Sequence, residues 1–274
     1  MKKACTFILI LIMISVLAGS GCTDGVPKNN TSVSENTGMT FEGQQLAVCS
    51  GAGLMKPMNE LVEQFENETG ADIQVHYGGS AELFGILTSK ECDVFIPGAY
   101  YYTQQAMENN YVINESVVNL TLHIPAIAVP TGNPGNITNL TDLANPGIKL
   151  ALGDPQGPAI GKVSKTLCSK AGILPEVENN TIVRTSTVNQ LLIYVVSGEV
   201  DATIIWEDMA SWGEAQGKLE VIPIPEDENQ IKTIPTAVST YAQNPELAEA
   251  FSQYVASEEA KAYWEKWGFE PCAS

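Results

Sequence analysis

Residues 46–54 read LAVCSGAGL, an apolar strand-like run that ends in a turn of serine and glycine. The segment 54–67 behind this turn carries apolar residues at helical spacing, namely Leu54, Met58, Leu61, Val62 and Phe65. This spacing places them on one face of a helix that can be buried. The same order of strand, turn, helix and strand recurs along the chain. Such alternation predicts βαβ units with helices on the faces of a sheet, and therefore an α/β fold.

The expected elements fall into two series. The first has strands at 46–49, 73–77 and 93–96, with helices at 54–67 and 81–88. The second has strands at 149–152, 181–185 and 202–206, with helices at 159–171 and 188–197. The apolar run 124–130 leads from the first series to the second, and the Pro-punctuated stretch 221–239 leads back to closing helices at 246–255 and 258–267. This order predicts two lobes joined by two crossover strands that form a hinge, with lobe 1 at 42–126 plus 232–274 and lobe 2 at 127–231.

The first forty residues carry the features of an export signal. Lys2 and Lys3 precede the apolar run 7–17, and small residues lead from it to Cys22. This run is shorter than the about 20 residues of a membrane-spanning helix, which favours a signal peptide at 1–21. A cysteine directly after small residues resembles a lipoprotein signal, so we expect Cys22 to carry a lipid anchor and 22–41 to be a flexible polar tether. Simple cleavage, with Cys22 an ordinary thiol, is the alternative.

Sequons and charge indicate where the chain works and which partners it lacks. Eight Asn-x-Ser/Thr acceptors, from Asn29 to Asn179, are typical of an exposed chain outside the cell. The chain has 32 acidic against 14 basic residues and a formal charge of −18. That balance excludes nucleic acid and anionic lipid surfaces as partners, because both require basic patches. We therefore expect a protein on the outer face of the cell membrane, held there by its lipid anchor.

The six cysteines include no CxxC pair, so a zinc site is not expected. Four of them follow the tether, namely Cys49, Cys92, Cys168 and Cys272. An extracellular setting permits disulfides, but a bridge between the lobes would lock the hinge. We therefore expect any disulfide to lie within lobe 1, which leaves two thiols unpaired.

Four strand-to-helix turns carry small or hydroxyl residues where a helix is expected to begin. They read SGAG at 50–53, GGSA at 78–81, GDPQGP at 153–158 and WED at 206–208. Ligands of open α/β sheets lie at the carboxyl ends of strands, where helix N-termini expose unpaired N–H groups and a partial positive charge. Glycine lets that backbone approach a ligand, and Ser50 and Ser80 can donate hydroxyl hydrogen bonds, although either serine could equally be an N-cap. Several such turns in one cleft predict an oxyanion site without arginine.

Over residues 45–268 the chain resembles the molybdate- and tungstate-binding receptors of ABC importers. The matching segments are AVCSGAGL at 47–54, GGSAEL at 78–83, DVFIPGA at 93–99, LGDPQGPAIGK at 152–162 and GEVDA at 198–202. The fourth is similar to a "GDP…PAG" turn of that family. The resemblance implies a two-lobed periplasmic-binding-protein (type II) fold with mixed sheets, which closes on its oxyanion and delivers it to a membrane permease and its ATPase. It also implies a monomeric binding protein without catalysis or cofactor.

The resemblance carries ligand contacts onto this chain by position. They are Ser50, Ser80, Gly157 or Ala159, Glu207 and a backbone contact near Ala128. Glu207 departs from bacterial members, which have tyrosine there, whereas archaeal relatives have glutamate and coordinate the metal of the oxyanion directly. Glu207 is then a protonated donor or a ligand of that metal. Alternatively it is an N-cap, or it faces away while Trp206 or Asp208 lines the cleft.

Other functions remain open at this point. The same fold could bind sulfate, phosphate or ferric ion, and a sensor ectodomain would share fold and ligand. The tyrosines Tyr100–Tyr102 could hold ferric iron, but a packed loop is the preferred interpretation. Lys162 and Lys165 either add positive potential to the site or lie on a solvated helix face. A hydrolase using Ser50 or Ser80 with His76 lacks a base and an orienting partner, and His123 has no partner in the sequence either.

Overall fold

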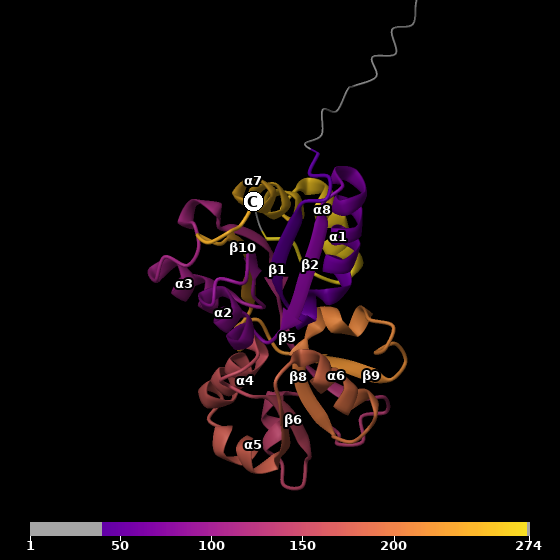
Figure 1. Cartoon of the computed structure of the whole chain (residues 1–274). Coiled ribbons are helices and arrows are strands. Elements are labelled where there is room, and N and C mark those ends of the chain that lie inside the picture. Colours follow the sequence, from indigo (N-terminus) through magenta and orange to yellow (C-terminus); the bar gives the residue numbers. More distant parts are fainter. Residues whose placement is uncertain (1–39, 273–274) are drawn as a thin grey trace, which may run out of the picture. The chain divides into compact units, whose positions relative to one another are not determined.

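Two five-stranded sheets, one in each lobe, organise the computed structural model, which describes residues 40–272 (Figure 1). The expected signal peptide, Cys22 and the tether up to residue 39 lie outside the described residues. Within residues 40–272 no helix combines the length and the apolar character that a membrane crossing requires.

The sheet of lobe 1 has the strand order β2-β1-β3-β10-β4. Its strands are β1 (Gln45–Gly51), β2 (Asp72–Gly78), β3 (Val94–Ile96), β4 (Val118–His123) and β10 (Lys232–Val238). β1 pairs in parallel with β2 and β3, whereas β10 runs antiparallel to both β3 and β4. The parallel strands therefore end at one edge of the sheet, where β1 reaches Gly51 and β2 reaches Gly78.

The sheet of lobe 2 has the order β7-β6-β8-β5-β9. Its strands are β5 (Pro125–Pro130), β6 (Leu150–Gly153), β7 (Thr181–Thr185), β8 (Ala202–Trp206) and β9 (Leu219–Pro223). β6 is parallel to β7 and β8, and β5 is antiparallel to β8 and β9. Both sheets are mixed, so the expected two-lobed α/β fold with mixed sheets is confirmed.

Helices cover both sheets. Lobe 1 carries α1 (Met55–Thr69), α2 (Ser80–Thr88), α3 (Tyr100–Glu108), α7 (Pro245–Val255) and α8 (Glu258–Lys266). Lobe 2 carries α4 (Ala159–Lys170), α5 (Leu174–Asn180) and α6 (Val188–Val196). Short 3-10 helices lie at η1 (Ala52–Leu54), η2 (Asn114–Ser116), η3 (Leu140–Ala144) and η4 (Glu207–Ser211). Helix α1 ends where Gly70 takes a left-handed conformation with φ 75° and its N–H donates to the Glu66 carbonyl, which is a common way to stop a helix.

The Tyr-rich segment is helical, so its interpretation as a packed loop is wrong. The first residues of α3 are the three tyrosines, and Thr103 and Ala106 on its inner side are fully buried. Burial at this i, i+3 spacing stabilises a helix whose sequence alone is a poor helix former. The tyrosines lie at the start of the helix, where they line one space together with Pro158 and Ala159 of lobe 2.

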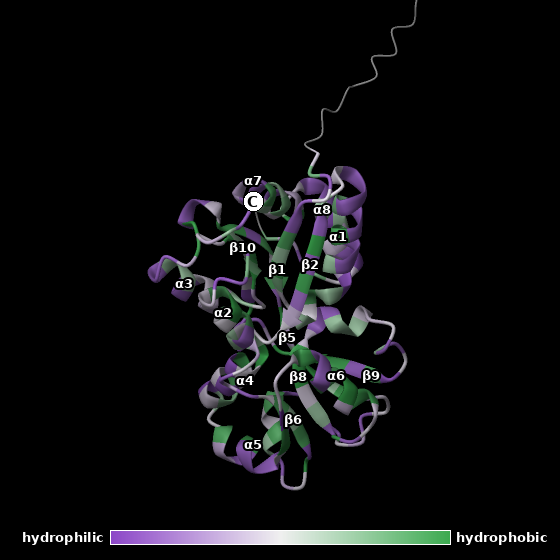
Figure 2. Ribbon diagram, viewed as in Figure 1, coloured by the Kyte–Doolittle hydropathy of each residue, from purple (hydrophilic) through white to green (hydrophobic). Residues whose placement is uncertain are grey.

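Each lobe has a hydrophobic core of its own. In lobe 1, α1, α7 and α8 pack on one face of the sheet around Leu46 and Val48, while Cys49 faces α2 and α3 on the other. The core of lobe 2 surrounds β5, β6 and β8. Hydrophobic residues accordingly run along the strands of both lobes, whereas hydrophilic residues are frequent on the outer helices (Figure 2).

Two short crossovers join the lobes. The chain leaves lobe 1 after His123 and begins β5 at Pro125, two residues before the expected boundary, and it returns between Pro223 and Lys232. The buried side-chain amide of Asn229 donates to the carbonyls of Pro125 and Ile224, at 2.9 and 3.3 Å. One side chain thus ties the two crossovers together.

Candidate functional site

The strand-to-helix turns of both lobes meet at a small cavity of about 20 Å3. Its lining residues are Gly51, Ala52, Gly53, Gly78, Gly79, Ser80, Gly98, His123, Pro158, Ala159, Val188 and Trp206. The cavity lies at the carboxyl ends of β1, β2, β3 and β8, the edge at which α/β sheets bind ligands. Among these lining residues there is no Asp, Glu, Lys or Arg, so the polar groups are those of the backbone, one hydroxyl, one imidazole and one indole. We call this space the glycine-lined cavity.

Glycine is required here because the two lobes approach each other through their backbones. A Cβ at Gly79 in lobe 1 would lie 2.5 Å from the carbonyl oxygen of Ser186 in lobe 2; within lobe 1, a Cβ at Gly51 would lie 3.1 Å from the Gly98 nitrogen. The N–H of Ala81 in lobe 1 donates to the carbonyl of Gly157 in lobe 2, at 3.2 Å. The structure therefore shows the lobes in contact around the glycine-lined cavity.

Ser80 lies in the cavity wall at the start of α2. It is 2% exposed, and its Oγ accepts a hydrogen bond from the Gly98 N–H at 3.2 Å. A hydroxyl that accepts in this way keeps its own proton for donation. The structure gives the N-cap position of α2 to Gly79, so Ser80 is not occupied with capping and can donate into the cavity.

Ser50 is placed differently. It is fully buried, it does not line the glycine-lined cavity, and its Oγ has no hydrogen-bond partner among residues 40–272. The same turn presents Gly53 instead, where a Cβ would lie 3.4 Å from Trp206 and 3.7 Å from His123. The short helix η1 follows β1 at this point, and its residues Ala52 and Gly53 line the cavity together with Gly51. The lining therefore begins at the residue directly after Ser50.

The third turn contributes through Pro158 and Ala159. Ala159 is the first residue of α4, so the positive end of a twelve-residue helix adjoins the cavity. Gly157 is not in the lining, because its N–H donates to Asp154 at 2.9 Å and its carbonyl accepts from Ala81. Ala128 lies inside β5, fully buried in the core of lobe 2 and away from the cavity.

Glu207 lies outside the glycine-lined cavity, and Trp206 takes its place. The side chain of Glu207 lines a separate cavity of about 90 Å3 together with Asp208 and Glu270. Burial raises the pKa of the Glu207 carboxyl, and Glu270 and Asp208 raise it further. Of the interpretations drawn from the sequence, the geometry agrees with the one in which Glu207 faces away. No cluster of three or more His, Cys, Asp or Glu side chains suited to a metal ion occurs within the described part of the chain.

His123 is the site residue that sequence reasoning missed. It is 1% exposed, and its ring stacks on Trp206 with centroids 3.9 Å apart and planes 9° apart. Its Nδ1 lies 2.9 Å from the Gly98 carbonyl, which can only accept, so Nδ1 carries a proton. Its Nε2 faces Asp208 Oδ1 at 3.4 Å. The sequence does not predict these contacts of His123, because Gly98, Trp206 and Asp208 come from distant segments.

Asp208 is the buried partner of this imidazole. Burial raises the pKa of the Asp208 carboxyl, while the hydrogen bond and charge of His123 lower it. His76, by contrast, pairs with Glu82 at 3.0 Å on the half-exposed surface of lobe 1. Among residues 40–272 neither serine of the hydrolase interpretation hydrogen-bonds to His76: Ser50 Oγ has no partner, and Ser80 Oγ accepts from the Gly98 N–H.

Comparison with known proteins places this geometry in a family. A profile of the family described as "Bacterial extracellular solute-binding protein" matches residues 46–270. A "Putative binding protein" of Haemophilus influenzae is 27% identical over 86% of this chain and 94% of its own length. The "Putative ABC transporter substrate-binding lipoprotein YvgL" of Bacillus subtilis is 24% identical over 98% of both chains. The "Molybdate-binding protein ModA" of Escherichia coli is 23% identical over 82% of this chain and 88% of its own.

Solved structures share the fold at low sequence identity. A periplasmic molybdate-binding protein of Azotobacter vinelandii has a TM-score of 0.70 at 17% identity, covering 83% of this chain and all of that one. The sulfate-binding protein SubI of Mycobacterium tuberculosis has a TM-score of 0.71 at 19% identity, covering 83% and 87%. A periplasmic thiamin-binding protein has a TM-score of 0.74 at 14% identity, covering 86% and 87%. The fold is thus shared by proteins named for quite different solutes.

Proposed function

Because this chain belongs to the bacterial extracellular solute-binding protein family, the receptors of ABC-type transporters, we propose that it captures a small oxyanion, molybdate or tungstate in the first place. The observation that carries this proposal is the glycine-lined cavity itself. Unpaired N–H groups at helix starts and the hydroxyl of Ser80 are donors that suit an anion. A ferric ion would need several oxygen ligands such as carboxylates, and the lining of this cavity contains no carboxylate.

The positive end of α4 supports the same ligand class. Backbone donors and a helix terminus stabilise an anion without a neutralising arginine. Glu207 has no part in this proposal, since its side chain lines the separate cavity with Glu270. Ser80, Gly53 and Ala159 are the positions that we propose for ligand contact, with His123 and Trp206 as the aromatic wall.

Entry of the ligand requires the lobes to move. The cavity volume of about 20 Å3 is room for one or two waters, because one water needs at least about 10–15 Å3. A tetrahedral oxyanion is larger than water, so the contact between Ala81 and Gly157 has to open and then re-form around it. Hinge closure of this kind couples binding to delivery.

Sulfate is the second candidate. The cavity is small, and sulfate needs less space than molybdate or tungstate. A sulfate-binding protein of Synechococcus elongatus is 23% identical over 89% of this chain and 77% of its own length. Sulfate recognition would use the same donors as molybdate, so only measured affinities separate the two.

We propose further that the protein is exported, lipid-anchored through Cys22 on the outer face of the membrane, monomeric, and served by a permease and an ATPase. The printed name of YvgL, which calls that protein a lipoprotein and aligns over 98% of both chains, supports the anchor. The names of the matched proteins are those of binding proteins, which supports a role without catalysis.

Calorimetric titration of the mature chain with molybdate, tungstate, sulfate and phosphate at neutral pH tests the proposal, with tryptophan fluorescence as a second signal. We expect one-to-one binding of molybdate and tungstate, with sulfate and phosphate weaker. Tight sulfate binding with the larger ions silent would move the assignment to the second candidate. Silence of all four ions would refute the oxyanion proposal.

A further inference from the structure

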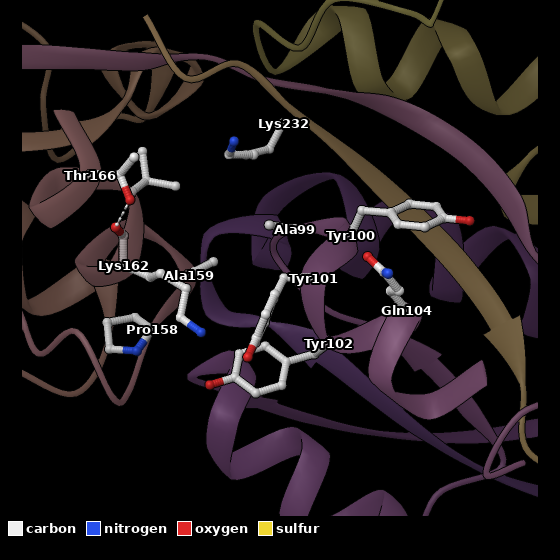
Figure 3. Close-up of a pocket in the computed structure, with 11 residues that line it drawn as sticks. Ala99, Tyr100, Tyr101, Tyr102, Gln104, Pro158, Ala159, Lys162, Thr166 and Lys232 are labelled. Carbon is white, nitrogen blue, oxygen red and sulfur yellow. Dashed lines mark hydrogen bonds between the residues drawn. The ribbon is translucent and has the colours of Figure 1, made fainter. Parts of the chain in front are cut away.

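A second and larger space opens beside the glycine-lined cavity, with a volume of about 300 Å3 (Figure 3). One wall comes from α3 and the residue before it, and the opposite wall comes from α4 and Pro158; Lys232 lies at the hinge. The lining residues are Ala99, Tyr100, Tyr101, Tyr102, Gln104, Pro158, Ala159, Lys162, Val163, Thr166 and Lys232. We call this space the Lys–Tyr groove. Pro158 and Ala159 line both spaces, so the two adjoin.

The charge of the Lys–Tyr groove is unusual for this protein. In a chain with 32 acidic and 14 basic residues, the groove contains two lysines and no carboxylate. Neither Lys162 nor Lys232 forms an ion pair with any described residue. The groove therefore holds uncompensated positive charge, which attracts an anion.

Both lysines are held where that charge faces the groove. The ammonium of Lys162 lies 3.3 Å from the ring centroid of Tyr101 and 5.5 Å from that of Tyr102, so the rings fix its position by cation–π attraction. Lys232 is half-buried, and the nearest hydrogen-bond acceptor of its ammonium is Gln230 Oε1 at 3.5 Å. Burial, with a smaller contribution from Lys170, lowers the pKa of Lys232. An anion beside it would offset both effects.

The walls of the Lys–Tyr groove suit the carbon skeleton of an organic ligand. Tyrosine rings, Pro158, Ala159 and Val163 give the groove mainly apolar and aromatic surfaces, with a few polar groups to orient a ligand. About 300 Å3 is the lower limit of pockets that hold organic ligands. The glycine-lined cavity, at about 20 Å3, is an order of magnitude smaller.

We propose that the receptor takes organic anions whose oxyanion group lies in the glycine-lined cavity and whose carbon body and second anionic group lie in the Lys–Tyr groove. The ligand class is a small phosphate ester that also bears a carboxylate. A free inorganic oxyanion fills only the first of these two places. This inference rests on the proposed function, because it assigns the oxyanion group to the same cavity.

Matched ligand pairs test the inference. The mature chain is titrated with ethyl phosphate against phosphoglycolate, and with phenyl phosphate against 4-carboxyphenyl phosphate, so that each pair differs by one carboxylate. We expect the carboxylate member of at least one pair to bind 10-fold or more tightly than its partner. Equal binding within both pairs would overturn the inference.

Substitutions of the two groove lysines test whether they cause the gain in affinity that the carboxylate brings. Lys162→Gln and Lys232→Gln should each reduce, at least 5-fold, the ratio of affinities between the carboxylate member of a pair and its partner. Lys165→Gln is the matched control, since Lys165 is an exposed lysine of the same helix that does not line the groove. A gain that survives both groove variants would also overturn the inference. Thermal unfolding of each variant checks that it is folded.

Molybdate, tungstate and sulfate are titrated in parallel, so that the two proposals can fail separately. If these ions bind but the carboxylate makes no difference, the groove inference falls and the oxyanion proposal stands. If neither the ions nor any ester binds, both fall.

Discussion

The imidazole of His123, the last residue of β4, faces the carboxyl of Asp208, in the short helix after β8, with Nε2 and Oδ1 3.4 Å apart and both side chains buried. Because Nδ1 of His123 already donates to Gly98, a hydrogen bond between the two side chains requires one further proton. That proton would sit on Nε2 or on the carboxyl, and in either case the pair would carry no net charge. The contact joins lobe 1 to lobe 2, and His123 itself lines the glycine-lined cavity.

Asp208→Asn and Asp208→Ala should separate the hydrogen bond from the charge. The amide of an asparagine can donate to Nε2 of a neutral His123, so we expect Asp208→Asn to change the free energy of unfolding by less than about 1 kcal/mol. Asp208→Ala leaves a buried ring nitrogen without a partner and should cost about 1–3 kcal/mol. Urea unfolding measures both. Equal destabilisation by the two substitutions would show that Nε2 does not depend on a donor at this position.

Ser80→Ala should weaken oxyanion binding about 10- to 100-fold, because a hydrogen bond to a charged group contributes about 1.5–3 kcal/mol. Calorimetric titration with molybdate measures the loss. Ser89→Ala is the matched control, since Ser89 is exposed at the other end of the same helix. Unchanged affinity in Ser80→Ala would remove this hydroxyl from the proposed site.

Gly79→Ala should abolish tight binding without unfolding either lobe. Its Cβ would lie 2.5 Å from the Ser186 carbonyl across the lobes, so the lobes could not close. Gly85→Ala, in the same segment of chain, meets nothing within 4 Å and should stabilise α2 by about 0.5–1 kcal/mol. Titration and urea unfolding of both variants give the comparison. Wild-type affinity in Gly79→Ala would mean that binding does not require this approach of the lobes.

Glu207→Gln should change how stability depends on pH. The pKa of the Glu207 carboxyl is raised in the folded protein by burial and by Glu270 and Asp208. A raised acid pKa contributes stability at pH below its unfolded pKa, about 4.3, and loses it as pH rises through the folded pKa. Wild type should therefore lose stability relative to Glu207→Gln as pH rises above about 4.3, the unfolded pKa.

Unfolding midpoints at a series of pH values measure this difference. Glu63→Gln, at an exposed position of α1, is the control and should show no such trend. A difference between wild type and Glu207→Gln that stays constant with pH would contradict the raised pKa.

Thiol reactivity should follow burial. Cys49, Cys92 and Cys168 are buried, and burial raises the pKa of Cys168 to about 11, so little thiolate exists at pH 8. Cys272 is partly exposed and should be alkylated first. Timed iodoacetamide labelling with peptide mapping tests this order. Rapid labelling of Cys168 in the native protein would require an opening of lobe 2 that this packing does not show.

The periodicity of the chain predicted most of the fold, because strands and amphipathic helices are encoded locally. The family resemblance was confirmed at the level of solute-binding proteins, while molybdate and tungstate remain proposed ligands. Helix α3 could not be predicted in this way. Its tyrosines are poor helix formers, and the burial of Thr103 and Ala106 that stabilises it comes from the surrounding lobe.

The site was predicted best where backbone rather than side chains decides it. The turn at Gly78–Ser80 and the start of α4 meet as the order of elements indicated. The short 3-10 helix η1, whose Ala52 and Gly53 line the cavity where Ser50 does not, could not be predicted from the local sequence. Trp206 displaces Glu207 from the cavity because its indole stacks on His123, a contact between residues that are far apart in the chain.

The side-chain amide of Asn229 restricts how the two lobes can move relative to each other. Its amide holds the carbonyls of Pro125 and Ile224 together, so the outgoing and returning linkers are clamped at one point. Linkers clamped in this way cannot pivot independently. Any opening of the lobes therefore has to bend both linkers about this one point, and Asn229 is not among the residues that line the glycine-lined cavity.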